Sequence, residues 1–436
     1  MAKQARIGRR AFLKRSAGGL AAASALPSIV PAAALGKAGK LPPSDRVVVG
    51  FIGTGNLGRS HHLRKFCLQN EKVAPRVDVA AVCDVDRNRR DQAARDCKEI
   101  AGRRVGVYED FRRLLERKDL DAVFVVTPDH WHALAAIAAM EAGLDVYCEK
   151  PLTLTIAEGQ AMVAAARRYG TVFQTGSQQR SNGQFLQACE LVRNRKIGRL
   201  IRVDTHIGGT GPGTWEPPQT PPDELNWNFW LGPAPYRDYR KGHVHYEFRW
   251  FLDFSGGKMT DWGAHHNDIA QWGIGADGSG PTSVEPTKFK FHEDGPYDVA
   301  GEFEVHYQYA NGVELVCQSS GKNGIKFTGE DGWIFVNRGG IEASDPDILK
   351  IKLGPNDIRL YKSDHHHLNW LDCIASRERC ICDVEIGYRS VTVCHLGNIA
   401  MRLGRPLKWD PQAEKFVGDE AANQLISKPM RAPWHL

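Results

Sequence analysis

The sequence predicts an α/β chain with an N-terminal doubly wound parallel sheet and a C-terminal α/β domain that carries a large, mostly antiparallel open sheet. From Val47 to about Thr175, apolar runs alternate with helical patterns, which is typical of a parallel sheet with crossover helices. Between about 283 and 353, alternating runs are separated by turn signals such as Asn311-Gly312, which indicate antiparallel hairpins. A length of 436 residues suits two domains.

The first 34 residues predict an export signal. Gly8-Arg9-Arg10-Ala11-Phe12-Leu13-Lys14 precedes an apolar stretch rich in Ala, Gly and Ser that ends at Ala32-Ala33-Ala34. This pattern is typical of a twin-arginine signal with an A-x-A cleavage site. Pro27 and Pro31 interrupt the apolar run, which is too short to span a bilayer. We expect residues 1–34 to be cleaved and the mature protein to be periplasmic or extracytoplasmic; a basic arm or an uncleaved anchor is the alternative.

The leader also accounts for the formal net charge of +6. It holds six basic residues and no acidic ones, so the rest of the chain has 57 − 6 = 51 basic residues against 51 acidic residues. A mature chain without net charge has no electrostatic reason to bind nucleic acid or an anionic membrane. We therefore expect neither nucleic acid as a partner nor stable membrane insertion after signal cleavage.

The apolar strand Val47–Ile52 runs directly into Gly53-Thr54-Gly55-Asn56-Leu57-Gly58, a G-x-G-x-x-G loop. Gly53 allows the tight turn, Gly55 lets the backbone approach a pyrophosphate, and Gly58 lets the following helix pack closely on the strand. A pyrophosphate bound there lies at a helix N-terminus. The loop therefore predicts a dinucleotide site.

Asp84 ends the next apolar run, Val77–Cys83. A carboxylate at this position accepts hydrogen bonds from a ribose 2′-hydroxyl and repels a 2′-phosphate, so NAD is favoured over NADP, although Arg87 keeps NADP open. We predict a Rossmann domain over residues 45–175. Its further strands are expected at Ala122–Val126, Val146–Cys148 and Val172–Gln174, with helices at 57–69, 87–100, 109–117, 130–142 and 155–169.

The regular alternation of strand and helix patterns ends after Gly176, and we predict a substrate and oligomerisation domain over residues 176–405. A Pro-, Gly- and Trp-rich stretch, 208–245, has little periodicity; loops of this length are usually functional or form an interface. Residues 406–436 are expected to be a loop-like tail. The elements expected in this half are a helix at about 183–195, strands at Leu200–His206, Gly301–Tyr309, Val313–Ser319 and Gly332–Asn337, and helices at about 365–376 and 385–403.

Glu149-Lys150-Pro151 follows the strand Val146–Cys148, so Lys150 stands at the carboxyl end of a strand, where open parallel sheets bind ligands. A lysine there can present a cation to a substrate hydroxyl whose oxygen gains negative charge as hydride leaves carbon. The alternative is a solvated lysine paired with Glu149.

Asp261 and His265 lie four residues apart, so on one helix they would share a face. A neutral imidazole can take a hydroxyl proton near neutral pH, and a nearby carboxylate can orient the ring. With Lys150 these residues form an acid–base set suited to interconverting an alcohol and a ketone. The alternative is a helix-capping Asp261 and a core histidine.

Other polar residues are candidates for ligand contacts. Thr127, Pro128 and His130, at a strand-to-helix turn, and Glu149 are expected on the cofactor side. Arg180 could bind substrate oxygens or form a structural ion pair, and His266 and His366 are further substrate candidates. His61-His62, His243-x-His245 and His265-His266 make a metal conceivable, but we predict no metal site.

The glycine loop, Asp84, Thr127-Pro128-Asp129-His130, Glu149-Lys150-Pro151 and Asp261-x-x-x-His265 together resemble the Gfo/Idh/MocA oxidoreductases, the family of glucose-fructose oxidoreductase and inositol dehydrogenase. The resemblance covers residues 45 to about 405. It implies catalytic positions for Lys150, Asp261 and His265, a Rossmann domain followed by an α/β domain with a large open sheet, and homodimers or homotetramers formed through that sheet.

These features favour an NAD(P)-dependent oxidoreductase acting on a CH–OH group of a sugar, cyclitol or related carbohydrate. A periplasm offers no ready pool of free NAD, so an exported protein is expected to hold its cofactor tightly. One alternative is an NAD-dependent glycoside hydrolase, which works by transient oxidation, elimination and re-reduction; its tyrosine base has no motif here. A further alternative is a non-catalytic sugar- and dinucleotide-binding protein.

Overall fold

The computed structural model describes residue 42 and residues 45–436, and Val47–Leu436 form one compact unit. The expected twin-arginine signal, residues 1–34, lies outside the described residues.

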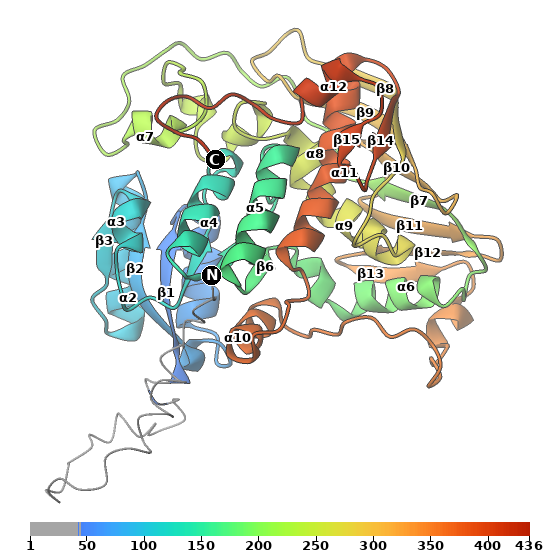
Figure 1. The fold of residues 1–436 in the computed structure, drawn as a ribbon, viewed down its shortest axis with the longest axis horizontal. Coiled ribbons are helices and arrows are strands. Elements are labelled where there is room, and N and C mark those ends of the chain that lie inside the picture. Colours follow the sequence, from blue (N-terminus) through green and yellow to red (C-terminus); the bar gives the residue numbers. More distant parts are fainter. Residues whose placement is uncertain (1–41, 43–44) are drawn as a thin grey trace, which may run out of the picture. The chain divides into compact units, whose positions relative to one another are not determined.

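The N-terminal half of this unit is a six-stranded, all-parallel sheet of order β3-β2-β1-β4-β5-β6 (Figure 1). The chain moves outward from β1 in one direction and then from β4 in the other, so a crevice opens at the carboxyl ends of β1 and β4, where such sheets bind ligands. The strands are β1 (Val47–Ile52), β2 (Val77–Cys83), β3 (Gly106–Tyr108), β4 (Ala122–Val125), β5 (Asp145–Cys148) and β6 (Phe173–Thr175). The short β3 was not predicted from the sequence.

Helices connect these strands, and α2 and α5 begin at polar caps. The Asp86 carboxylate accepts the Arg89 N–H at the start of α2, and Thr155 and Glu158 form a capping box at the start of α5. The helix that follows the glycine loop, η3, is wound as a π-helix. The helical segments here are η3 (Leu57–Leu68), η4 (Ala74–Arg76), α2 (Arg87–Ala101), α3 (Phe111–Leu115), η5 (Asp129–Trp131), α4 (His132–Glu141), α5 (Ile156–Tyr169) and η6 (Gln178–Ser181).

The second half is built on a nine-stranded sheet of order β13-β12-β11-β7-β10-β9-β8-β14-β15, in which only β7 and β10 pair in parallel. The predicted α/β class and its two sheets are therefore confirmed. The strands are β7 (Leu200–His206), β8 (Ser283–Phe291), β9 (Ala300–Gln308), β10 (Glu314–Gln318), β11 (Gly324–Gly329), β12 (Trp333–Asn337), β13 (Gly340–Ala343), β14 (Leu407–Asp410) and β15 (Lys415–Phe416).

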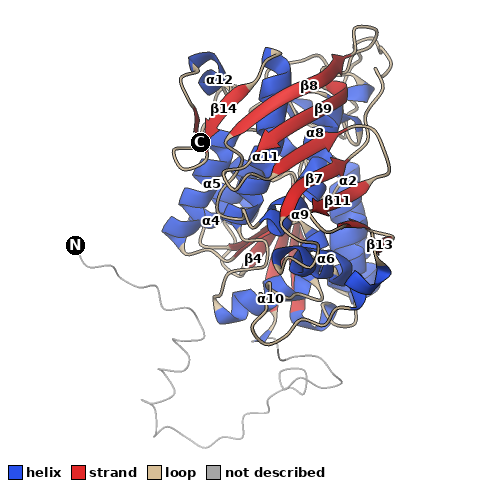
Figure 2. Ribbon diagram, turned by 90° about the vertical axis from the view of Figure 1, so that its right-hand side faces the viewer, coloured by secondary structure: helices blue, strands red, loops and turns tan. Residues whose placement is uncertain are grey.

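Figures 1 and 2 place α9 and α11 on one side of this sheet. The side chains that alternate toward these helices, such as Val305 and Tyr307, are buried, whereas their neighbours Glu304 and His306 lie on the opposite face, where the two side chains contact each other. α11 also contacts α5, so one helix joins the two sheets in a shared core. The helical segments here are α6 (Gly183–Arg193), α7 (Trp227–Leu231), η7 (Lys241–His243), η8 (Glu247–Trp250), α8 (Gly257–Asp261), α9 (Gly263–Ile274), η9 (Pro346–Lys350), α10 (His366–Ser376), α11 (Val384–Leu403) and α12 (Glu420–Gln424).

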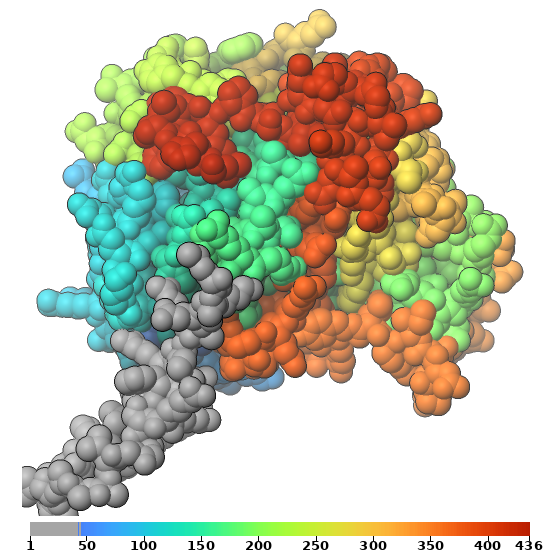
Figure 3. Space-filling view, viewed as in Figure 1, coloured from blue at the N-terminus to red at the C-terminus, as the bar shows by residue number. Residues whose placement is uncertain are grey.

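The C-terminal segment corrects one expectation. Residues 406–436 were predicted to be loop-like, but β14 pairs with β8 and extends the large sheet, and β15 and α12 follow. Only long-range pairing makes so short a strand stable, so its own sequence carries little signal. After α12 the C-terminal segment runs back over the surface beside residues of the α7 region (Figure 3). There the Arg431 N–H donates to Pro233 O and Trp434 packs on Trp131.

Candidate functional site

A cavity of about 600 Å³ opens at the carboxyl edge of the parallel sheet. One wall comes from the glycine loop and the ends of β2, β4 and β5, a second from residues 225–249, and a third from the region between α8 and α9. Nine of the predicted cofactor residues line it: Gly53, Gly55, Asn56, Leu57, Asp84, Thr127, Pro128, Glu149 and Lys150.

The three loop glycines are needed for different reasons. Gly53 has φ +92°, and a Cβ on it would lie 2.4 Å from Val126 O. A Cβ on Gly58 would lie 2.3 Å from Gly53 O, so this glycine allows the close packing of η3. Gly55 instead lines the cavity, and the one atom that its Cβ would approach is Arg89 Nη1, at 3.0 Å. The missing side chain at Gly55 therefore leaves room for a pyrophosphate, and the loop fits a dinucleotide.

Asp84 lies in the cavity wall beside this loop. Its Oδ2 accepts the Thr54 N–H at 2.8 Å and its Oδ1 accepts the Asp86 N–H at 3.0 Å. Burial raises the pKa of Asp84, and these two N–H groups and Arg89 oppose that rise. Each carboxylate oxygen has a second lone pair, which can accept a ribose hydroxyl. Arg87, which the sequence left as a possible 2′-phosphate contact, is exposed and does not line the cavity.

Lys150 and Asp261 form an ion pair inside the cavity. Lys150 Nζ lies 2.7 Å from Asp261 Oδ1 and also donates to Asp261 O at 3.1 Å; the side chains are 12% and 11% exposed. Arg249 Nε lies 3.5 Å from the same Oδ1. Burial alone would raise the pKa of Asp261, but the charges of Lys150 and Arg249 lower it to about 2. The carboxylate thus stays ionised and holds Lys150 in place.

His265 faces the cavity from the start of α9 and is 5% exposed. Its Nδ1 is buried and has no hydrogen-bond partner among the described residues. Burial, followed by the charges of Lys150 and Arg338, lowers the pKa of His265 well below 6.5, so the ring is neutral at pH 7 and can accept a proton.

The structure corrects the expected relation between Asp261 and His265. Asp261 ends α8 and His265 belongs to α9, with Trp262 between the two helices, so the residues do not share one continuous helix. The carboxylate turns to Lys150 because an ion pair within a partly buried site outweighs a contact with a neutral ring. The expected carboxylate–imidazole contact is replaced by a carboxylate–lysine pair.

Glu149 lines the cavity but is not the partner of the Lys150 ammonium group. Its Oε1 accepts from His62 Nε2 at 3.0 Å and its Oε2 accepts the Lys150 N–H at 3.0 Å. His62 Nδ1 lies 2.9 Å from His367 Nε2, which extends the row of buried polar groups into α10. Burial would raise the pKa of Glu149, but His62 and Lys150 lower it below its ordinary value.

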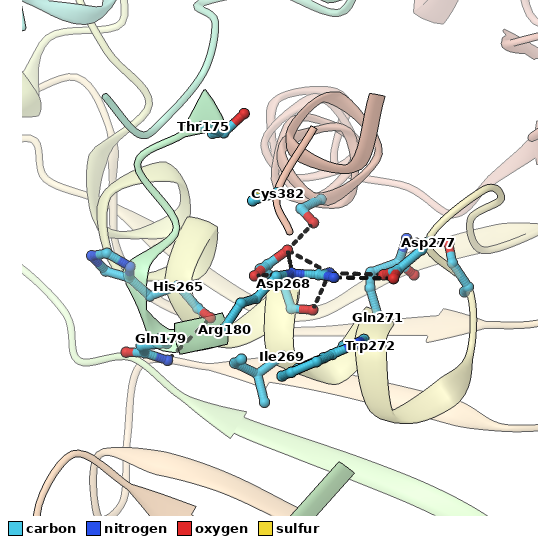
Figure 4. Close-up of polar contacts among 12 residues, drawn as sticks. Thr175, Gln179, Arg180, His265, Asp268, Ile269, Gln271, Trp272, Asp277 and Cys382 are labelled. Carbon is cyan, nitrogen blue, oxygen red and sulfur yellow. Dashed lines mark hydrogen bonds and ion pairs between the residues drawn. The ribbon is translucent and has the colours of Figure 1, made fainter. Parts of the chain in front are cut away.

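Arg180 does not line the cavity, contrary to its proposed role as a substrate ligand. Figure 4 shows it between Asp268 and Asp277. It is 1% exposed, and its guanidinium nitrogens donate to Asp268 at 2.8 Å and to Asp277 at 2.7 Å. A buried guanidinium needs compensating carboxylates, and both are supplied by or next to α9. The alternative of a structural ion pair therefore describes Arg180.

Four further predicted residues lie outside the cavity wall. His266 approaches Gln179 and Asn323, and His366 approaches Ser181 and Thr175 O, so both imidazoles are used inside the protein. His130 faces Trp230 O, and Thr54 holds Asp84. Burial lowers the pKa of His130, His266 and His366 to about 4 in each case. None of these four residues lines the cavity, and the side-chain contacts of the three histidines are made within the protein.

Some cavity residues were not identified from the sequence. Gln178 lies two residues before Arg180, and Trp262 lies between Asp261 and His265. Arg249 and Tyr246 lie just after the long irregular segment, and Arg338 lies in a turn between β12 and β13. No local pattern distinguishes such an arginine from a solvated one. Among residues 42 and 45–436, no group of three or more His, Cys, Asp or Glu side chains is arranged to hold a metal ion. No helix in that part of the chain is both long and apolar enough to cross a membrane.

Comparison with known proteins gives matches over both halves of the chain. Residues 47–177 match the "Oxidoreductase family, NAD-binding Rossmann fold" and residues 210–436 match the "Oxidoreductase family, C-terminal alpha/beta domain". The structure is similar to that of levoglucosan dehydrogenase in complex with NADH and levoglucosan, with a TM-score of 0.60 and 19% identity over 83% of this chain and 99% of the other.

Curated relatives are similar over about a third of the chain. Inositol 2-dehydrogenase of Salmonella paratyphi B is 32% identical over 155 residues, which is 35% of this chain and 44% of the relative. Alpha-N-acetylgalactosaminidase of Shewanella oneidensis is 35% identical over 148 residues, 32% of this chain and 31% of the relative. The matched part thus spans less than half the length of either relative.

Proposed function

Because the chain belongs to the Gfo/Idh/MocA oxidoreductase family, through both its NAD-binding and its C-terminal domain, we propose that it is an NAD-dependent oxidoreductase. It oxidises a hydroxyl group of a sugar, cyclitol or related carbohydrate. The observation that carries this proposal is the meeting of Lys150, Asp261 and His265 in the cavity that the glycine loop also lines. An inositol dehydrogenase among the curated relatives supports the substrate class.

The chain's own residues divide the work at the substrate hydroxyl. The Lys150 ammonium, held by Asp261, donates a hydrogen bond to the substrate oxygen and stabilises the negative charge that develops on it. The neutral His265 ring, which lines the cavity, takes the hydroxyl proton. NAD, when bound, supplies the hydride acceptor. Trp262 and Phe248 in the wall limit the access of water.

Residues 222–249, here called the strap, support the proposal of a tightly held cofactor. The strap is joined to the carboxyl end of β2, because Arg87 N–H donates to Glu224 O at 2.8 Å and Asn226 N–H donates to Val85 O at 3.1 Å. Further along the strap, Arg89 Nη2 donates to His245 Nδ1 at 2.6 Å. Arg89 and His245 both line the cavity, so this contact spans the dinucleotide side of it. A bound dinucleotide could leave only after these bonds break.

The acids around the dinucleotide side favour NAD over NADP. Asp84, Asp86 and Glu109 all line the cavity there, and Arg89 is already engaged by His245 and Asp86. A 2′-phosphate would therefore meet net repulsion. To test identity and retention together, the protein is purified without nucleotide and denatured, and the supernatant is analysed by absorbance and mass. We expect near-stoichiometric NAD(H); NADP(H) would overturn the cofactor choice, and an empty protein would overturn retention.

A glycoside hydrolase that uses NAD transiently is the second candidate. It is supported by the alpha-N-acetylgalactosaminidase among the relatives and by Tyr246, the one tyrosine among the described residues that line the cavity. This candidate predicts that aryl glycosides release their aglycone without net formation of NADH and that Tyr246→Phe slows this release more than it slows alcohol oxidation. Equal release by protein stripped of nucleotide would exclude it. A non-catalytic sugar- and dinucleotide-binding protein would show neither activity.

We further propose that the chain is exported by the twin-arginine route and forms a homodimer or homotetramer. Replacing Arg9 and Arg10 with lysine should leave an uncleaved precursor in the cytoplasm, as seen by fractionation and mass of the intact chain. Light scattering on the mature protein measures the subunit number, and a monomer at micromolar concentration would contradict the second part.

A further inference from the structure

Arg338 presents a positive charge at the catalytic end of the cavity, and no carboxylate of the described chain forms an ion pair with it. The residue lies in the turn between β12 and β13, is exposed, and lines the cavity together with Lys150 and His265. No Asp or Glu of residues 42 and 45–436 lies within ion-pair distance of it. Its nearness to the catalytic histidine is also seen in the pKa of His265, which burial, Lys150 and then Arg338 lower.

The nearby acids already have partners. Asp261 holds Lys150 and approaches Arg249, Glu149 accepts from His62, and the Asp129 carboxylate accepts from Ser255. None of these acids is available to pair with Arg338 without giving up a buried contact, which is costly.

Arg338 is also held in one position. Its guanidinium lies 4.8 Å from the centre of the Trp262 ring, and its Nε donates to Gln179 Oε1 at 3.0 Å. Gln179 Nε2 donates in turn to His265 O at 3.3 Å, so the amide links the arginine to the catalytic helix. The turn is itself fixed, because Asn337 Oδ1 accepts the N–H groups of Gly339 and Gly340. The two terminal nitrogens of Arg338, Nη1 and Nη2, are therefore held in place as a pair of donors for a ligand.

We infer that the substrate is an anionic sugar whose oxyanion group, a carboxylate as in a hexuronate, binds the terminal nitrogens of Arg338 while the hydroxyl to be oxidised lies at Lys150 and His265. This inference rests on the proposed function. A planar guanidinium fork matches a carboxylate with two parallel hydrogen bonds. Arg249, 3.5 Å from Asp261, adds positive charge to the same end of the cavity, and Trp262 gives the ring an apolar face.

The first test compares turnover. NAD-loaded protein is assayed with D-glucuronate, D-glucose and D-glucose 6-phosphate, and kcat/KM is measured for wild type, Arg338→Gln and the control Arg199→Gln. Arg199 is an exposed arginine paired with Glu330 outside the cavity. We expect wild type to prefer an anionic sugar, and Arg338→Gln to reduce the ratio of anionic to neutral sugar by roughly 10- to 100-fold, the range for a lost charge-assisted hydrogen bond. Arg199→Gln should leave the ratio unchanged.

A preference for glucose, or an unchanged ratio in Arg338→Gln, would overturn the inference and leave the proposed oxidoreductase function standing. A preference for D-glucose 6-phosphate over D-glucuronate would overturn the assignment of a carboxylate, but the substrate would still be an anionic sugar.

The second test does not need turnover. Calorimetric titration of the same three sugars into protein with NAD bound should show glucuronate binding in wild type that weakens at least tenfold in Arg338→Gln. If no sugar is oxidised but this binding is found, the proposed function fails and the anionic site stands. If wild type binds no anionic sugar, the inference fails.

Discussion

Replacing Lys150 with methionine removes the ammonium group from the Asp261 ion pair while it keeps the length of the side chain. The substrate oxygen then loses its charged hydrogen-bond donor, so we expect turnover to fall by roughly 10²- to 10⁴-fold, the usual range for a positioned acid or base. The nucleotide should remain bound, because the glycine loop and Asp84 are untouched.

The same change has a calculable effect on stability. In the wild type, the pKa of Asp261 is about 2, below its ordinary value of 3.8, because Lys150 and Arg249 outweigh the effect of burial. A folded-state pKa that is depressed in this way stabilises the folded chain above about pH 4 by ~2 kcal/mol, and this contribution is lost as the pH falls toward 2. In Lys150→Met the largest of the opposing charges is gone and only Arg249 and Lys258 remain, so burial pushes the pKa of Asp261 up and the contribution shrinks or reverses. We expect the melting temperature at pH 7 to fall by roughly 2–5 °C.

The assay measures kcat, bound nucleotide and the free energy of unfolding between pH 3 and 8 for each variant. Lys258→Met is the matched control, because Lys258 is a cation near Asp261 that does not line the cavity. The reasoning is refuted if Lys150→Met turns over within about threefold of wild type, or if its stability changes with pH as the wild type's does.

Three more predictions follow from the same geometry. Since burial and Lys150 lower the pKa of His265 well below 6.5, the acid limb of kcat/KM should lie below pH 6.5, and His265→Gln should abolish that limb together with most activity; an acid limb at 6.5 or above would contradict the assignment. Arg180→Met should destabilise the fold by about 3–5 kcal/mol, as read from denaturant unfolding, because Asp268 and Asp277 lose their partner; an altered KM at unchanged stability would restore a substrate role. Asp84→Asn should weaken NAD binding by roughly tenfold or more in a fluorescence titration and reduce the ratio of NAD affinity to NADP affinity. Unchanged affinities would show that Asp84 does not bind the ribose.

Local pattern was sufficient for most of the framework. β1, β2 and β7 have the bounds expected from the sequence, because a buried strand entering a glycine turn and a strand of alternating polarity both leave short-range signals. The strands at residues 106–108, 324–329 and 407–410 were not predicted, for the opposite reason. Those segments are short, and their hydrogen bonds come from partners far away in the sequence.

For the site, too, some features follow from local sequence and others only from the folded chain. The sequence by itself determined the glycine loop, Asp84, Lys150, Asp261 and His265 as candidates, because turns, strand ends and helical spacing are local properties. Only the tertiary structure decided that Asp261 pairs with Lys150 rather than His265, that Arg180 is enclosed by two carboxylates, and that Arg338 reaches the cavity from the β12–β13 turn. Each of these outcomes depends on which side chains lie near a buried charge, and those neighbours come from segments that are distant in the chain.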